Sequence, residues 1–358
     1  MTVNRSVLSR TVLAGVALAS LSVAACATNT PDPTPSGSAA GSEYASLEGT
    51  LKGTGASFPN NFYQAALDEF EKVAPDLVIT YEATGSGAGK KDFAGNLNDF
   101  AGTDSTVKDT DGPAPGSYYY IPTVAAPITV SFNLAGVTEV KLSPDTLAKI
   151  FQRDIKDWSD AAITADNGTA LPAKPITVVH RSDGSGTTNN FTKYLVAAAP
   201  AWKLASGDTV QWPTDTQGAE KNGGVAQLIK STDGAIGYVD FADANKAALS
   251  FASIKNKDGN FVKASLAGAT AALSGAEIKD DLTYNPINAP GADTYAITAP
   301  TYLLVHPTYT DAAKGVLVKG FIKWLLTDGQ AIAEANGYAK LPAELQTKAL
   351  AKLDSVKA

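Results

Sequence analysis

Cysteine and histidine are scarce in this sequence of 358 residues. It contains one cysteine and two histidines, His180 and His306, so we expect neither a disulfide framework nor a Cys/His zinc site, and no cofactor. Basic residues are also too few for a nucleic-acid partner, with 29 Lys and Arg against 36 Asp and Glu and a net charge of −7. Affinity for a nucleic-acid backbone comes mainly from Lys and Arg. Since the overall charge is negative, any bound anion must be held by residues in its immediate surroundings.

The chain also has no apolar run long enough to cross a membrane. Residues 11–25 are uncharged but short, and no later stretch reaches about 18 uncharged apolar residues. Because Arg5 and Arg10 precede this run and small residues end it, residues 1–25 are predicted to be a secretory signal peptide. The next residue, Cys26, is in a setting similar to the lipobox of bacterial lipoproteins, which implies a lipidated N-terminus. The alternative is an ordinary signal peptide with an incidental cysteine.

The segment after Cys26 has almost nothing apolar to bury. Residues 27–46 are rich in Pro, Ser, Thr and Gly, so residues 26–46 are predicted to be a lipidated cysteine followed by a flexible linker. Removal of residues 1–25 leaves 27 Lys and Arg against 36 Asp and Glu, a net charge of −9. We therefore expect an exported, acidic body that is lipid-anchored at the extracytoplasmic face of a bacterial membrane.

Strands and helices alternate from about Leu47, which is typical of an α/β fold. Residues 77–82 and 175–180 read as strands, and residues 62–73 have an apolar helical face. Alternation of apolar residues over 128–132 predicts a half-buried strand. At ~150 residues per domain, the length of the chain predicts about two domains.

Three polar, glycine-containing segments stand where a strand or loop meets a helix. The free N–H groups and dipole of a helix N-terminus favour an anion, and glycine lets the anion approach the backbone. Arg181 in the third segment offers a rigid fork of donors, which Asp183 can hold in place. No segment has the Gly-Lys-Ser/Thr ending of a P-loop. The segments are residues 53–59 (Gly-Thr-Gly-Ala-Ser-Phe-Pro), 84–89 (Thr-Gly-Ser-Gly-Ala-Gly) and 181–188 (Arg-Ser-Asp-Gly-Ser-Gly-Thr-Thr).

Asp104 ends a short predicted strand over residues 100–104 and favours a protonated anion. An ionised carboxylate only accepts hydrogen bonds, so it can take the proton of phosphate but faces sulfate with no hydrogen to share. Phosphate still carries a proton near neutrality, with a second pKa of about 6 in phosphoesters, whereas sulfate carries none. The alternative is that Asp104 merely caps a nearby turn. Lys90 and Lys91 are interpreted as a solvated pair at a helix start and lie outside this pattern.

These motifs resemble the PstS family, the phosphate-binding proteins of high-affinity phosphate ABC transporters. The resemblance rests on residues 53–59, 85–87, 102–104 and 181–187, with Trp212-Pro213 and residues 234–239 in support. It implies a two-lobed periplasmic-binding-protein fold of the type II kind, with the ligand in the inter-lobe cleft. It further implies a monomer that binds inorganic phosphate and delivers it to an ABC-transporter permease, without chemistry. The residues after Trp212-Pro213 depart from the glycine-rich family pattern.

The resemblance also assigns the ligand contacts, with Asp183 orienting Arg181. Lobe I would combine residues 47–124 and 297–358, and lobe II would comprise residues 125–296. The hinge crossings would lie near residues 123–127 and 295–299. The implied phosphate-binding residues are Ser57, Phe58, Ser86, Asp104, Arg181, Ser185, Gly186 and Thr187.

Two rival functions remain at this stage. A secreted serine hydrolase or phosphatase could use Ser86 or Ser185 with His180, although neither serine lies in a Gly-x-Ser-x-Gly elbow. The same fold could instead bind another oxyanion, such as sulfate. Assays of ester hydrolysis and anion competition separate these possibilities.

Overall fold

The computed structural model describes residues 43–108 and 110–358, which form one compact α/β unit. The predicted signal peptide, Cys26 and most of the predicted linker lie outside the described residues. The strands are β1 (Gly49–Gly55), β2 (Leu77–Glu82), β3 (Phe100–Thr103), β4 (Tyr119–Asn133), β5 (Lys141–Leu142), β6 (Thr177–Arg181), β7 (Gln217–Ala219), β8 (Ala235–Asp240), β9 (Ser250–Phe251), β10 (Ser253–Lys255), β11 (Phe261–Lys263) and β12 (Thr298–Val305).

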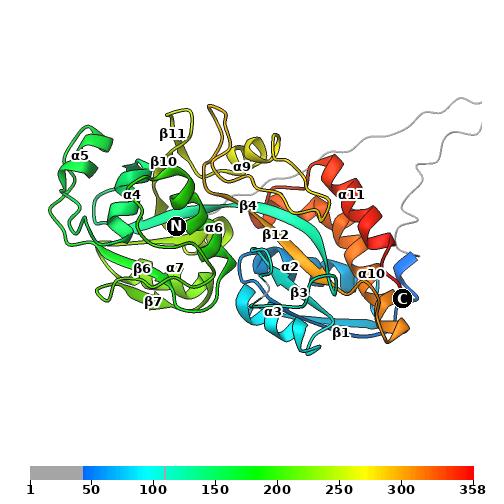
Figure 1. Ribbon diagram of the computed structural model, residues 1–358. Helices are drawn as coiled ribbons and strands as arrows, with labels where there is room; N and C mark the ends of the chain where they lie inside the picture. The colour runs from blue at the N-terminus through cyan, green and yellow to red at the C-terminus, as the bar shows by residue number, and fades with distance from the viewer. Residues whose placement is uncertain (1–42, 109) are drawn as a thin grey trace, which may run out of the picture. The chain divides into compact units, whose positions relative to one another are not determined.

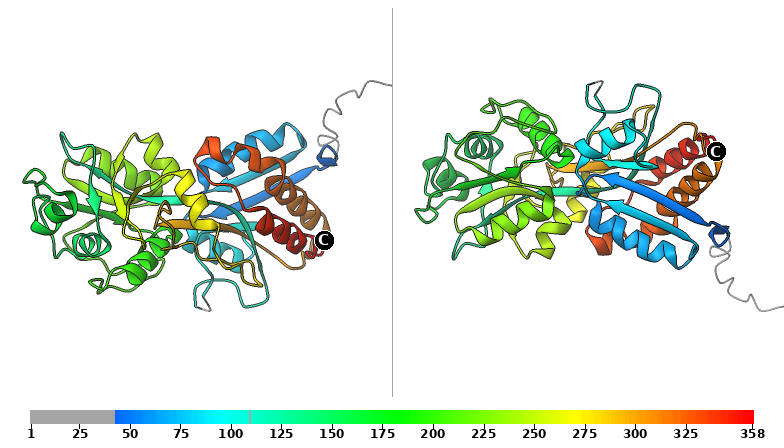
Figure 2. Two further views of the ribbon diagram at one scale, coloured as in Figure 1. Left: turned by 90° about the horizontal axis from the view of Figure 1, so that it is seen from above. Right: turned by 90° about the horizontal axis from the view of Figure 1, so that it is seen from below.

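Helices connect most of these strands and cover the faces of the sheet (Figures 1 and 2). The α-helices and two 3₁₀ helices are α2 (Asn60–Glu71), α3 (Ser86–Ala94), α4 (Pro144–Phe151), α5 (Ala161–Asn167), α6 (Gly186–Ala198), α7 (Lys221–Ser231), α8 (Phe241–Lys246), α9 (Leu266–Leu273), α10 (Ala312–Leu326), η1 (Asp328–Ile332), η2 (Glu334–Asn336) and α11 (Ala343–Asp354).

One long strand, β4, joins the two halves of the main sheet. The strand order is β2-β1-β3-β12-β4-β8-β6-β7, and β9 also pairs with β4. Up to Pro127 β4 pairs with β12, and from Ile128 onward it pairs with β8. The change of partner divides the described residues into two lobes that share β4 (Figure 1). Lobe I contains β1, β2, β3 and β12, whereas lobe II contains β6, β7 and β8.

The local sequence explains most of these elements. Residues 77–82 form β2 as predicted, and α4 begins at Pro144, directly after its N-cap residue Ser143. The expectation of a half-buried strand at residues 128–132 is wrong, since that part of β4 is buried on both faces. A central strand covered by helices on both sides has no solvent face.

The packed body begins before Leu47. Tyr44, which the sequence analysis placed in the linker, is only 4% exposed and packs edge-on against Phe70 of α2, with the ring centroids 5.6 Å apart. Phe70 in turn packs against Phe321 and Trp324 of α10, so this aromatic cluster links the start of the body to lobe I. Within residues 43–108 and 110–358, no helix has the length and apolar character needed to cross a membrane.

Candidate functional site

The three glycine-containing segments meet where the two lobes touch. The Gly85 N–H donates to the Gly55 carbonyl at 2.7 Å, which joins the first two segments within lobe I. The Gly87 N–H donates to the Gly184 carbonyl of lobe II at 3.0 Å. A Cβ placed on Gly186 would lie 2.6 Å from the Ser86 hydroxyl and 2.7 Å from the Asp104 Cβ. The lobes are therefore closed upon one another, and glycine at position 186 permits this approach.

Four backbone N–H groups around this contact have no hydrogen bond to any other described residue. They belong to Phe58, Ser86, Gly186 and Thr187, and they come from both lobes. Ser86 and Gly186 begin α3 and α6, where the first turn of a helix leaves its N–H groups unpaired. The helix dipole adds positive potential at these ends. The arrangement suits an anion held mainly by backbone donors.

Arg181 provides the charged donor of the site. Its side chain is 1% exposed, and its Nε donates to Oδ1 of Asp183 at 2.6 Å while Nη2 pairs with Oδ2. The remaining nitrogen, Nη1, is buried and has no partner among the described residues. Burial alone would raise the pKa of Asp183, but hydrogen bonds and charge from Arg181 lower it. Asp183 thus stays ionised and fixes the guanidinium so that Nη1 is left for another ligand.

Asp104 is the acidic group beside these donors, and it is 2% exposed. Its Oδ1 accepts from the Thr301 hydroxyl at 2.7 Å, and its Oδ2 lies 3.4 Å from the Ser86 hydroxyl. Burial raises the pKa of Asp104 to about 7, against the opposing effects of Thr301 and Arg181. The side chain therefore does more than cap a turn, because it occupies the cleft next to Ser86 and Gly186.

Asn222 is a cleft residue that the sequence analysis missed. It is fully buried near the start of α7, and its Nδ2 donates to the hydroxyls of Ser57 at 3.2 Å and Thr187 at 3.1 Å. Its N–H also donates to the Ser57 hydroxyl at 3.3 Å. Both hydroxyl oxygens are thereby occupied as acceptors, which leaves their hydrogens free to donate to a ligand. Asn222 follows the segment that departs from the family pattern, so no motif singled it out.

Ser185 offers its hydroxyl and not its N–H. The Ser185 N–H donates to the Asp208 carbonyl at 2.9 Å, and its Oγ caps α6 by accepting from the Thr188 N–H at 3.1 Å. The hydroxyl hydrogen is left available. The segment around Arg181 thus supplies one side-chain nitrogen, two helix N–H groups and the hydroxyls of Ser185 and Thr187.

The geometry gives no support to a serine hydrolase. Both ring nitrogens of His180 are engaged, Nδ1 with the Arg181 carbonyl at 2.9 Å and Nε2 with the Thr216 hydroxyl at 3.0 Å. The ring stacks on Trp212, and burial lowers its pKa. Within the described part of the chain, neither Ser86 nor Ser185 has a hydrogen bond to histidine. Ser-His catalysis requires a hydrogen bond between the serine hydroxyl and the histidine ring, either in the free protein or once substrate is bound.

The interpretation of Lys90 as a solvated lysine is wrong. Its side chain is completely buried, and Nζ lies 2.9 Å from Oδ2 of Asp208 in lobe II. Lys91 is exposed, as expected. Because successive residues on a helix point in different directions, α3 directs one lysine into the cleft and the next into solvent.

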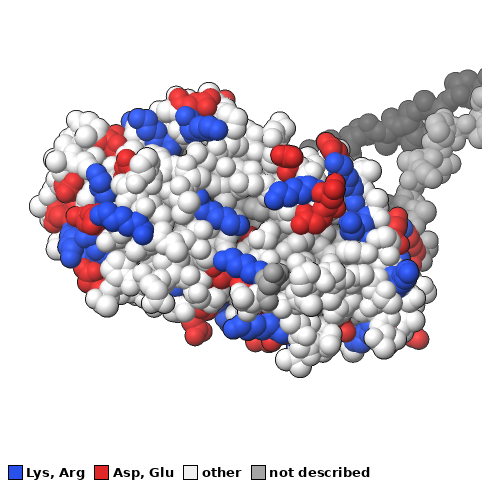
Figure 3. Space-filling view, in the orientation of Figure 1, with Lys and Arg blue, Asp and Glu red and all other residues white. Residues whose placement is uncertain are grey.

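One cavity lies at the junction of the lobes, and another lies away from it. One, of about 220 Å³, reaches Asp104 and is lined by Lys193 and Lys279. Basic side chains are visible near the junction of the lobes in Figure 3.

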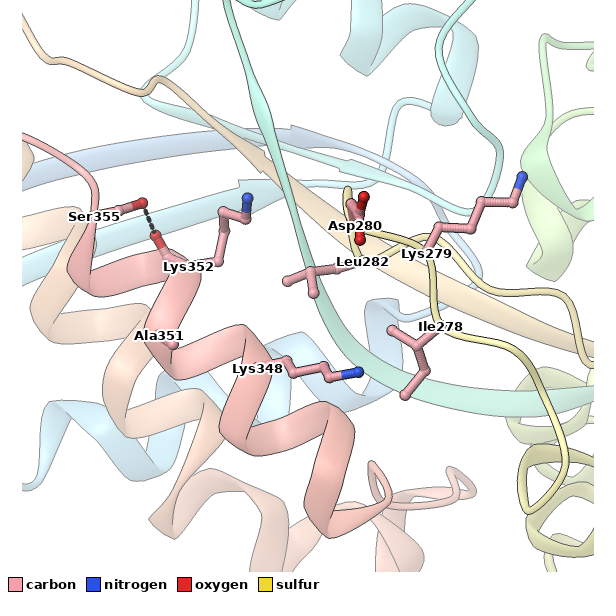
Figure 4. Close-up of a pocket in the computed structure, with 8 residues that line it drawn as sticks. All are labelled: Ile278, Lys279, Asp280, Leu282, Lys348, Ala351, Lys352 and Ser355. Atoms are coloured by element: carbon pink, nitrogen blue, oxygen red, sulfur yellow. Dashed lines mark hydrogen bonds between the residues drawn. The ribbon is translucent and has the colours of Figure 1, made fainter.

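A second cavity, of about 400 Å³, lies away from the three glycine-containing segments. Lys348 and Lys352 project into it from α11 toward residues 278–282 (Figure 4). No group of three potential metal ligands occurs among the residues that the structure describes.

Comparison with known proteins agrees with this geometry. The PBP superfamily domain model matches residues 34–329. The phosphate-binding protein PstS of Methanocaldococcus jannaschii is 34% identical over 339 residues, covering 86% of this chain and 86% of that protein. The phosphate-binding protein PstS 3 of Mycobacterium tuberculosis is 35% identical over 316 residues, covering 84% of each.

A solved structure shares the fold at lower identity. The high-affinity periplasmic phosphate-binding protein PfluDING, bound with phosphate, has a TM-score of 0.70 and 24% identity, covering 85% of this chain and 93% of that chain. A phosphate-binding protein from Stenotrophomonas maltophilia has a TM-score of 0.67 and 23% identity, with 85% and 93% covered. The fold is thus the two-lobed fold of periplasmic binding proteins, and the chain belongs to the PstS family of phosphate-binding proteins.

Proposed function

We propose that this protein binds inorganic phosphate between its lobes and delivers it to an ABC-transporter permease without catalysing a reaction. The observation that carries this proposal is the buried Nη1 of Arg181, which has no hydrogen-bond partner among the described residues. Four backbone N–H groups at the contact between the lobes also have no partner among those residues. A buried charged donor left unsatisfied is costly unless a ligand completes it. A tetrahedral oxyanion matches donors that converge from three helix or loop starts.

Each predicted residue has a proposed role in the site. Ser57, Ser185 and Thr187 donate hydroxyl hydrogens, while Phe58, Ser86, Gly186 and Thr187 donate backbone N–H groups. The Ser86 hydroxyl donates to Oδ2 of Asp104. Arg181 donates from Nη1, and Asp183 holds it in position. Asn222 orients the hydroxyls of Ser57 and Thr187. Dipolar donors then carry most of the binding, which makes affinity only weakly sensitive to salt.

Asp104 selects phosphate over sulfate. When ionised, it accepts the proton of the ligand, and near neutrality phosphate carries a proton whereas sulfate carries none. Oδ1 accepts a short hydrogen bond from the Thr301 hydroxyl at 2.7 Å, whereas Oδ2 accepts only a long one from the Ser86 hydroxyl at 3.4 Å, so Oδ2 is the oxygen assigned to the ligand. Sulfate would place its oxygen against this carboxylate with no hydrogen between them.

Hinge motion of the lobes opens and closes the site. The proposed boundaries, residues 47–124 with 297–358 for lobe I and 125–296 for lobe II, fall close to the change of partner in β4 between Pro127 and Ile128. The hinge crossings are assigned to residues 123–127 and 295–299. Rotation at two crossing strands opens the cleft and leaves each lobe intact.

The protein acts as a monomer at the extracytoplasmic face of the membrane. In this proposal residues 1–25 direct export, lipid on Cys26 anchors the protein, and the linker lets the body reach its permease. The support is the sequence pattern around Cys26 together with membership of a transport family. Metabolic labelling with a fatty acid tests the anchor, and Cys26→Ser should abolish the label.

Titration calorimetry tests the binding function. The chain from residue 27 onward, unfolded and refolded to remove endogenous ligand, should bind phosphate one to one and much more tightly than sulfate at pH 8. Arg181→Ala should abolish detectable phosphate binding, whereas Arg153→Ala, which alters another arginine of lobe II paired with Asp215, should not. Absence of phosphate binding by the unaltered protein, or hydrolysis of a chromogenic phosphate ester at the cleft, would overturn the proposal.

A further inference from the structure

Lys90 is a buried cation outside the proposed ligand contacts. It lies in α3 of lobe I, four residues after Ser86, and its side chain is 0% exposed. Its Nζ is 3.4 Å from both the Ser105 hydroxyl and Oδ1 of Asp111, which precede β4 and belong to lobe I. Its shortest contact, at 2.9 Å, is to Asp208.

Asp208 approaches Lys90 from the opposite lobe. It lies between α6 and β7, and its side chain is 10% exposed. Its Oδ2 also accepts from the Ser105 hydroxyl at 3.1 Å, so two lobe I groups meet one carboxylate oxygen. Its Oδ1 accepts from Nδ2 of Asn189 at 2.8 Å, and its carbonyl accepts from the Ser185 N–H. Asp208 therefore connects lobe I with the first turn of α6.

The closed state depends on this pair more than the open state does. In the closed state Lys90 and Asp208 are both removed from water, and each needs the other to offset the loss of hydration. Opening the cleft separates the two residues and returns Asp208 to solvent, while Asp111 stays with Lys90 in the same lobe. Loss of the Asp208 charge thus leaves an under-compensated buried lysine only when the lobes are closed.

We propose that Lys90 and Asp208 form an inter-lobe ion pair that holds the cleft closed and sets the rate of ligand release. This inference rests on the proposed binding of phosphate. The pair touches no ligand in this assignment, so it acts by positioning the lobes. Its effect should appear in dissociation and not in association, because the pair forms only as the cleft closes.

Stopped-flow kinetics with phosphate test the inference. Asp208→Asn, which keeps the size of the side chain, should release phosphate at least tenfold faster with an association rate constant within threefold of the unaltered protein. Lys90→Met should also speed release. The double variant should release phosphate no more than twofold faster than Asp208→Asn alone, because the pair is already broken.

Two control variants separate this effect from local disturbance. Asp111→Asn removes an acid that contacts Lys90 within lobe I, and Asn189→Ala removes the bond of Asp208 within lobe II. Both should change release by less than twofold. Release by Asp208→Asn within twofold of the unaltered rate, or an equal effect of Asp111→Asn, would overturn the inference. If the unaltered protein failed to bind phosphate, the proposed function itself would fall, and the inference with it.

Discussion

Sulfate binding should appear as the pH falls, and Asp104→Asn should remove this pH dependence. Burial raises the pKa of Asp104 to about 7. Above that pH the carboxylate is ionised and repels sulfate, whereas below it the protonated carboxyl group can donate to a sulfate oxygen. Neither sulfate nor a guanidinium group changes its charge between pH 6 and 9, so the protonation of Asp104 controls the difference in sulfate affinity.

The magnitude follows from the distance between the pH and this pKa. At pH 9, two units above the pKa, protonating Asp104 costs about 2.7 kcal/mol at ~1.36 kcal/mol per unit. Sulfate affinity should therefore be about 100-fold weaker at pH 9 than its limit below pH 6, falling about tenfold per unit above pH 7. The amide that Asp104→Asn introduces donates at every pH, so the variant should show a flat profile.

Titration calorimetry with sulfate at pH 6, 7, 8 and 9 measures this profile. Repetition in buffers of different ionisation enthalpy should show uptake of about one proton per sulfate by the unaltered protein at pH 9, and none by Asp104→Asn. Asp154→Asn, which alters an exposed carboxylate paired with Lys203, should retain the slope. A variant at position 104 that kept the slope, or an unaltered protein without one, would refute the role of Asp104 as the selecting acceptor.

Further expectations concern the donors, the closure and the stability of the cleft. Asn222→Ala should weaken phosphate binding about tenfold by calorimetry, since two hydroxyls lose the donor that orients them; unchanged affinity would remove Asn222 from the site. Gly186→Ala should weaken binding at least 100-fold without lowering the melting temperature, because the atoms nearest its Cβ would be those of Ser86 and Asp104 in lobe I; X-ray scattering should show that the ligand-saturated variant stays open. Asp104→Asn should raise the melting temperature of the ligand-free protein at pH 8, where the unaltered protein buries a carboxylate. This advantage should shrink as the pH falls from about 7 toward 3.8, because the raised pKa means that the folded protein binds the proton more tightly than the unfolded chain does.

The residues proposed to bind the ligand lie in short local motifs, which is why the sequence singles them out, whereas Asn222 and Lys90 lie in no such motif. Arg181 and Asp183 are two residues apart in one turn, and Ser86 and Gly186 begin helices, so local sequence specifies their geometry. The roles of Asn222 and Lys90 depend on partners more than 100 residues away. No local pattern carries that information, and a lysine at a helix start is usually solvated.

The sequence by itself determined the alternation of strands and helices, the glycine turns that leave N–H groups free, and the carboxylate at position 104. These features follow from propensities and hydrogen-bonding chemistry within a few residues. Tertiary structure alone decided that β4 is buried on both faces, that Tyr44 belongs to the packed body, and that Lys90 meets Asp208 across the cleft. Each of these depends on burial against a distant segment, and burial is a property of the folded chain and not of the residue.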